Sequence, residues 1–311
     1  MDNKLQQAPQ RDASRGRVAP DIEQRFARLC TEVGRRGVIG FAPVEGVRLL
    51  PQQSQRLQDK LAAFASAPEL TAISFGLFYR EPEILAVPSA WQVKKTEQDP
   101  WNDYARAYQE LNRTLDHVSS VLAAELGGVA EKATIEGWAG TVQNVGDYFP
   151  HCVSHRAFAE AAGLGWRGRH GLIVTPEVGP ALRFATVFVP GRLSSLESRR
   201  DAPQEGVVTV ATSPESRRDA VATSPPRKLA GCGDCRACLD VCPILGQVYP
   251  AKEEGRQGLP LIPPLWGAST RDYREACRRR IHALGLVADV CGICVRACWG
   301  QVIGHPHVST T

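Results

Sequence analysis

CGDCRACLDVCP, at residues 232–243, places four cysteines at a C-x2-C-x2-C-x3-C-P spacing in this 311-residue chain. Three thiolates at this spacing wrap around one cubic iron-sulfur cluster, while the fourth lies on the helix that follows and faces a neighbouring cluster. A second group lies downstream, where residues 291–298 read CGICVRAC and Cys277 stands alone before them. Eight thiols therefore predict two 4Fe-4S clusters in a small ferredoxin-like domain.

The ligands are assigned by the crossover that is typical of two-cluster ferredoxins. One cluster is expected on Cys232, Cys235, Cys238 and Cys298, and the other on Cys242, Cys277, Cys291 and Cys294. Cys277 is the weakest member, because it sits in a basic, helix-like run and not in a tight motif. The clusters indicate a protein that moves electrons.

Zinc and disulfides are the alternatives for these cysteines. Tetrahedral zinc sites use two Cys-x2-Cys hooks, without a third or fourth cysteine at these offsets. Disulfides need an oxidising compartment, and the polar first 20 residues lack the apolar core of a secretion signal. We therefore expect reduced thiols in a cytoplasmic protein.

The composition allows a second domain, and the charge gives little sign of a nucleic-acid partner. Hydrophobic residues make up 43% of the chain, which is enough to bury a core larger than a cysteine-rich module provides. The net charge is +4 and the basic residues are spread, which gives little support for nucleic-acid binding. Because no apolar stretch approaches the roughly 18 residues that span a bilayer, no membrane association is expected.

A polar, repetitive segment separates the two expected domains. ESRRDA occurs at 197–202 and 215–220, and VATSP occurs at 210–214 and 221–225. Tandem polar repeats of this kind are typical of a solvated linker. The expected plan is a disordered tail at 1–20, an α/β domain at 21–191, a low-complexity linker or insertion at 192–230 and the cluster domain at 231–311.

Hydrophobic periodicity predicts an α/β (α+β) fold with a mixed sheet for the first domain. Apolar residues recur every three or four positions at 21–36 and 104–126, which predicts two helices. Buried strands are expected at 70–79, 171–175 and 183–189. Cys30, within the first helix, is expected to pack as a small apolar residue.

A glycine-rich run is the second chemical signal. Residues 162–184 read AGLGWRGRHGLIVTPEVGPALRF. Clustered glycines let a backbone approach a large flat ligand closely. Their order does not match the G-x-G-x-x-G turn of dinucleotide sites. An alternative, in which the glycines only shape turns, stays open.

This run resembles the signature shared by epoxyqueuosine reductases and reductive dehalogenases, which follow it with two 4Fe-4S motifs. The resemblance extends from about residue 21 to the last cysteine, with the linker as an insertion. It implies a cobalamin with its lower base displaced, reduced through the clusters by a donor such as ferredoxin or flavodoxin. The residues implied around the corrinoid are Gly163, Leu164, Gly165, Trp166, Gly168, Gly171, Thr175 and Pro176.

The resemblance leaves the proton donor open, because Phe149 stands where epoxyqueuosine reductases carry an acidic residue. The same segment offers Asp147, His151 and His155 as catalytic candidates, and histidine titrates in the useful range. In the alternative, His151 caps a helix at 153–162 and His155 is a satisfied interior residue. Cys152 is either a reactive thiol or a buried inert one.

Three functions are therefore considered. The first is a cobalamin-dependent iron-sulfur reductase that acts on a small organic substrate. The second is an electron-transfer or corrinoid-activating protein without substrate chemistry of its own. The third is a short-form tRNA epoxyqueuosine reductase, although the sequence after Cys298 lacks the helical repeats that help many family members to hold tRNA.

Overall fold

A computed structural model of the chain describes residues 19–49, 51–89, 99–133, 153–193, 208–210, 231–245, 276–277 and 279–304. The helices are α1 (Ala19–Glu32), α2 (Pro51–Lys60), α3 (Glu81–Leu85), α4 (Trp101–Leu126), α5 (His155–Ala161), α6 (Ala237–Val241) and α9 (Ile293–Ile303), with a 3-10 turn, η1 (Ala62–Phe64). The strands are β1 (Gly37–Pro43), β2 (Leu70–Phe78), β3 (Val129–Glu131), β4 (Trp166–Arg167), β5 (Ile173–Val174), β6 (Leu182–Pro190) and β7 (Val208–Val210).

The main sheet has the strand order β3-β6-β2-β1-β7, and β4 and β5 form a separate two-stranded hairpin. Every strand pair in the described part of the chain is antiparallel. The prediction of a mixed sheet was therefore wrong for these strands. The connection between β1 and β2 is consistent with this. Parallel neighbours would need a crossover connection, and the segment with α2 and η1 that joins these two strands does not form one.

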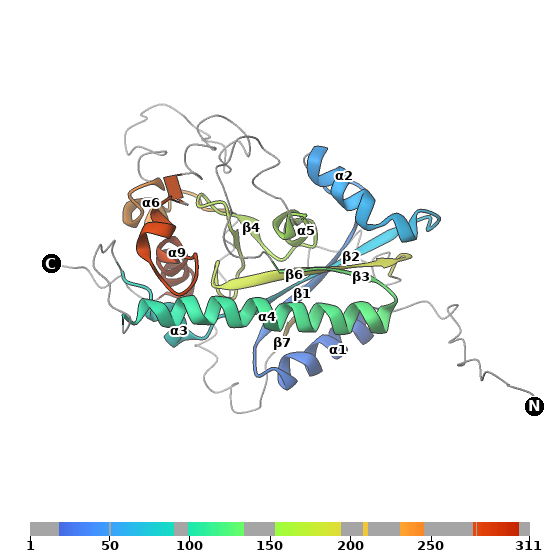
Figure 1. Cartoon of the computed structure of the whole chain (residues 1–311), viewed down its shortest axis with the longest axis horizontal. Helices are drawn as coiled ribbons and strands as arrows, with labels where there is room; N and C mark the ends of the chain where they lie inside the picture. The colour runs from blue at the N-terminus through green and yellow to red at the C-terminus, as the bar shows by residue number, and fades with distance from the viewer. Residues whose placement is uncertain are drawn as a thin grey trace, which may run out of the picture.

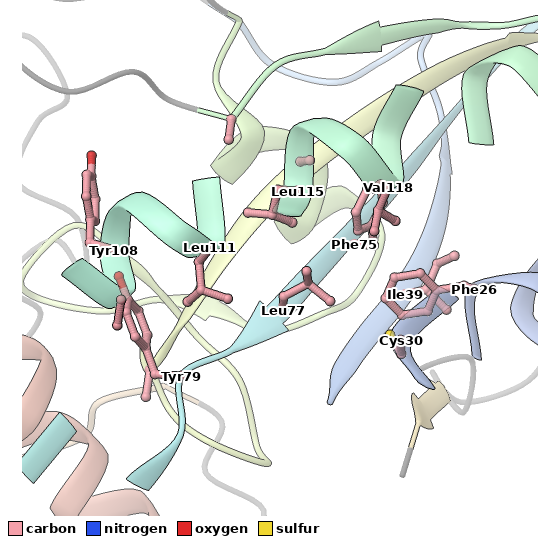
Figure 2. Packing of buried hydrophobic residues seen from close by; sticks show 14 of the residues in the cluster. Phe26, Cys30, Ile39, Phe75, Leu77, Tyr79, Tyr108, Leu111, Leu115 and Val118 are labelled. Carbon is pink, nitrogen blue, oxygen red and sulfur yellow. The ribbon is translucent and has the colours of Figure 1, made fainter. Parts of the chain in front are cut away.

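Helices cover both faces of this sheet, as Figure 1 shows. On one face, α1 and α4 contribute to the largest hydrophobic cluster, where the apolar stripe of α4 meets β2. Figure 2 shows Leu111 and Leu115 of α4 lying over this core, in which the rings of Phe26 and Phe75 are 5.3 Å apart. Cys30 is fully buried in the same cluster, which confirms its predicted packing. On the other face, α5 contacts β2 and β6.

Helix α4 is longer than the predicted helix and connects the two parts of the molecule. It begins at Trp101 and ends before Gly127, whose left-handed φ of 56° closes the helix. Figure 1 shows that its middle and last turns lie along the sheet, while its first turns reach toward α9. The cysteine-bearing segments are therefore docked at one end of the α/β layers.

Two domain boundaries differ from the predicted plan. Helix α1 begins at Ala19, inside the expected tail, and Pro20 in its first turn suits its start because proline lacks the N–H that remains unpaired there. Val208–Val210, inside the expected linker, pairs with β1 as an edge strand. The sequence VTV explains this, since β-branched residues favour strands. The repeats on both sides of β7 lie outside the described residues.

No helix in the described ranges is long and apolar enough to cross a bilayer.

Candidate iron-sulfur centre and glycine hairpin

Charge interactions relate the eight C-terminal thiols in two sets. The thiols whose charges act on Cys298 are those of Cys238, Cys232 and Cys235. The thiols that act most strongly on Cys294 are those of Cys291, Cys277 and Cys242, with a smaller effect from Cys238. These sets have the membership expected of crossed ligands, and Cys277 lies with the second of them. Ligation itself stays a prediction.

Helices α6 and α9 bring the two sets together. Their contact brings the CGDCRAC loop, which leads into α6, toward α9, whose middle turn carries Cys298 about 60 positions later in sequence. Burial raises the pKa of the Cys238 thiol to about 12 and raises that of Cys294 well above its usual value. An iron cluster would offset that cost, because its positive irons stabilise buried thiolates.

All nine cysteines in the described part of the chain are free thiols. The eight C-terminal thiols are grouped but not drawn into a cage, because no three His, Cys, Asp or Glu side chains of the described ranges are arranged to hold a metal ion. The donor set nevertheless suits iron-sulfur clusters, which take four thiolates each.

The first turns of α4 hold the second cysteine motif through backbone contacts. The indole Nε1–H of Trp101 donates to the carbonyl of Cys291 at 2.5 Å. Asn102 Oδ1 accepts the N–H of Val287 at 3.0 Å, while the Gln109 amide donates to the carbonyl of the same residue at 3.1 Å. These bonds fix the loop that leads into α9.

A pair of stacked tyrosines packs against this loop at Gly292. Tyr104 is 2% exposed, and its ring stacks on Tyr79 with centroids 5.0 Å apart. Gly292 has a φ of +80°, and an added Cβ would lie 2.7 Å from Cζ of Tyr104. The CGIC turn therefore requires glycine for both its backbone conformation and the space that the ring occupies.

The glycine run forms the β4–β5 hairpin and the turn that follows. Gly165 packs against the backbone of Val174, and an added Cβ at Gly168 would lie 2.8 Å from Cγ2 of that residue. Gly171 has a φ of +77°, which suits a turn. These glycines therefore serve the packing of the hairpin, the alternative that the sequence left open.

The other residues implied around a corrinoid are scattered around this hairpin. Leu164 is buried in a small core with Val38 and Leu182, and Pro176 is exposed. Thr175 is buried, and its hydroxyl donates to the carbonyl of Gly179 at 3.2 Å. Gly163 lies beside open space at the end of α5. The described contacts give a corrinoid no separate support, and cobalamin stays a prediction.

Polar atoms of the hairpin are buried without a hydrogen-bond partner in the described part of the chain, among them Nε1 of Trp166 and Nε2 of His170. His170 is 5% exposed, and burial lowers its pKa to about 4. The family resemblance had included Trp166 but not His170, whose only signal in the sequence was its place in the glycine run. Buried polar atoms of this kind suit a bound group that completes their hydrogen bonds.

His155, a catalytic candidate, lies at the start of α5 and is buried. Its Nε2 lies 2.7 Å from the carbonyl of Lys132, and its Nδ1 lies 3.0 Å from the hydroxyl of Thr186. Because a carbonyl only accepts, Nε2 carries the proton of the neutral ring and Nδ1 accepts from the threonine. Both nitrogens are used, so the geometry favours the interior alternative over a proton donor. The other candidates, Asp147, His151 and Cys152, lie outside the described residues.

Sequence comparison finds relatives of this chain. The epoxyqueuosine reductase of Bacillus anthracis is 23% identical over 139 residues, which cover 45% of this chain and 29% of that protein. The enzyme of Lactococcus garvieae is 23% identical over 208 residues, which cover 67% and 50% of the two chains. The chain is similar in sequence to epoxyqueuosine reductases. No family model matches the sequence.

Comparison with solved structures finds epoxyqueuosine reductases, each at a low TM-score to this chain. The Streptococcus thermophilus structure has a TM-score of 0.42 at 18% identity and covers 89% of this chain and 65% of that one. A structure with an epoxyqueuosine-modified tRNA-Tyr stem loop has a TM-score of 0.32 at 17% identity, covering 74% and 52%. The alignments span half the length of these sequence relatives or less.

Burial of His155 predicts an acid-sensitive fold for this epoxyqueuosine reductase-like protein. Burial lowers the pKa of His155 to about 4, from an ordinary value of 6.5. Between these values the unfolded chain binds the proton that the folded chain excludes, so stability is complete above pH 6.5 and falls as the pH falls toward 4. The full shift corresponds to roughly 3 kcal/mol. Urea unfolding at pH 7 and pH 5 measures the change.

A His155→Gln variant is expected to show a smaller loss of stability between the two pH values than the parent chain. His117→Gln is the matched control, because His117 is exposed on α4 and its replacement is expected to leave the pH dependence unchanged. Equal pH dependence in the parent and the His155→Gln variant would contradict the assignment of a buried neutral ring.

Proposed function

We propose that this protein is a two-cluster iron-sulfur reductase that reduces an epoxide of the epoxyqueuosine type. The observation that carries the proposal is the division of eight thiols into two sets of the expected crossed membership. The names of the sequence relatives supply the class of reaction. A cytoplasmic location and a low-potential donor, such as ferredoxin or flavodoxin, fit free thiols and remain part of the proposal.

Reduction of an epoxide takes two electrons and two protons. The products are either an alcohol, in which one C–O bond has been replaced by C–H and O–H, or an alkene and water, when both C–O bonds break. Each 4Fe-4S cluster supplies one electron per redox change, so two clusters match the electron demand of one turnover. The protons come from a donor at the reacting oxygen or carbon.

The two thiol sets are the groups that would hold the clusters. Buried contacts from α4 keep the second set in place, and the β4–β5 hairpin lies beside the first. If a corrinoid binds, it adds a strongly reducing metal centre, and the unpartnered atoms of Trp166 and His170 are the hairpin groups open to a ligand. Its presence rests on the family resemblance.

The substrate is proposed to be a modified nucleoside in tRNA, in preference to the small organic molecule expected from sequence. The relatives are named for epoxyqueuosine, and one solved epoxyqueuosine reductase holds a tRNA stem loop with that modification. Asp147 and His151 remain the proposed proton donors. A carrier without substrate chemistry is the second candidate, and it is favoured by the fully bonded ring of His155.

The experiment is anaerobic purification with iron and sulfide reconstitution, followed by single turnover of an epoxyqueuosine-modified tRNA stem loop. About eight irons per chain are expected. Mass spectrometry of the nucleoside is expected to show the loss of one oxygen or the gain of two hydrogens. Cobalt analysis after addition of cobalamin tests the corrinoid separately.

A Cys30→Ala variant is the control for this experiment, because this buried thiol lies outside both sets, and it is expected to keep both iron and turnover. Zinc in place of iron would overturn the proposal. A different result would support the electron carrier instead. In that case the chain binds iron and a partner protein reoxidises its reduced clusters, but the nucleoside stays unchanged.

A further inference from the structure

The glycine hairpin reaches the first cysteine motif through one arginine. Arg169 lies in the turn between β4 and β5, and its Nη2 donates to the carbonyl of Gly233 at 2.6 Å. Gly233 lies between Cys232 and Cys235 and has a φ of +47°. A hydrogen bond from a charged group to a loop carbonyl holds that loop more firmly than a neutral one. The arginine thus joins two segments about 64 positions apart.

The guanidinium is a positive charge placed on the loop of this set. Its contact with the carbonyl of Gly233 lies within the stretch that carries Cys232 and Cys235. Opposite charges attract over such short distances, so the arginine would stabilise negative charge held by this loop.

A cluster on four thiolates is anionic, and reduction adds one further negative charge. A fixed cation beside it favours the reduced form, which raises its reduction potential. We propose that Arg169 raises the reduction potential of the cluster expected on Cys232, Cys235, Cys238 and Cys298, and holds the loop of that cluster against the glycine hairpin. This inference rests on the proposed function.

Reduction of this cluster would take one electron and no proton. The electron would come from a low-potential one-electron donor, which is oxidised by one electron in the same step. The positive charge of Arg169 would favour the reduced form.

Arg169→Gln and Arg169→Lys in the full reconstituted chain test the proposal. In an EPR-monitored redox titration, the glutamine variant is expected to move the potential of the Cys298-set cluster to a more negative value. The potential of the other cluster and the iron content should stay unchanged. The lysine variant keeps the charge and is expected to stay close to the parent. The Cys298→Ser variant assigns the signals.

Arg156→Gln is the matched control. Arg156 donates to the carbonyl of Gly171 at 2.6 Å, so this variant removes an equal charge and a similar bond from the hairpin. Its potentials are expected to match those of the parent. Equal shifts in the Arg156 and Arg169 glutamine variants would overturn a specific role for Arg169.

Unchanged potentials in Arg169→Gln with full iron would also overturn the inference while leaving the proposed function intact. If the glutamine variant lost its cluster, the lysine variant decides: a parental potential supports the charge effect, and a lowered one overturns it. Failure of the parent chain itself to bind iron would instead remove the proposed function.

Discussion

Replacement of Cys298 with serine is expected to halve the iron content, from about eight to about four irons per chain. The reason is its place among the thiols of Cys232, Cys235 and Cys238, whose charges act on it. Cys238→Ser should remove the same EPR signal, because both variants take a ligand from one cluster. Iron analysis and EPR spectra of the dithionite-reduced chain measure the effect.

The contrasting variant is Cys294→Ser. Its thiol lies with Cys291, Cys277 and Cys242, so it should remove the other signal and leave the first. Cys30→Ala should keep both signals, because this thiol is buried among apolar side chains of the core and belongs to neither motif. If the Cys298 and Cys294 variants lost the same EPR signal, the crossed assignment of ligands to the two clusters would be wrong.

Replacement of Gly292 with alanine is expected to destabilise the folded chain by about 2–4 kcal/mol and to release iron from the Cys294 set. Two costs combine here. The left-handed backbone, with φ at +80°, strains any residue with a Cβ. The new methyl group would also press into the ring of Tyr104, which is buried and stacked on Tyr79. Urea unfolding and iron analysis measure the two results.

Gly285→Ala separates the two costs. Gly285 has a φ of +62° with open space around its missing side chain, so its replacement carries only the backbone strain, about 1 kcal/mol. A Tyr104→Ala background provides the second control, because removal of the ring should make Gly292→Ala cheaper. Equal losses in the Gly285 and Gly292 variants would rule out the ring contact as the cause.

Much of the fold was accessible from local pattern. The apolar stripe at 104–126 predicted α4 because a helix repeats every 3.6 residues, and the structure has a helix at Trp101–Leu126. Leu70–Phe78 and Leu182–Pro190 confirm two predicted strands. The strand at Gly37–Pro43 was missed, because the segment from Gly34 to Gly37 indicated only the end of the preceding helix, and burial on both faces removed the usual alternation.

Some features of the candidate site could likewise be predicted from the sequence, and others could not. Cysteine spacing alone predicted two thiol sets, because the reach of a short loop around a cube limits which sulfurs share one cluster. The hydrogen-bond partners of His155 come from a strand and a loop far away in sequence, so no local pattern marked it as an interior residue. Arg169 and Tyr104 are ordinary residues in sequence, and their place beside the cysteine loops follows only from packing.

The sequence by itself determined the number and spacing of the C-terminal cysteines, from which their grouping as cluster ligands is predicted, the main helix and two central strands, and the resemblance to epoxyqueuosine reductases. Each of these depends on residues close together in the chain or on a fixed period. Tertiary structure alone decided the antiparallel sheet, the docking of the cysteine motifs on the first turns of α4 and the contact of Arg169 with Gly233. These depend on buried contacts between distant segments, whose geometry no local spacing encodes.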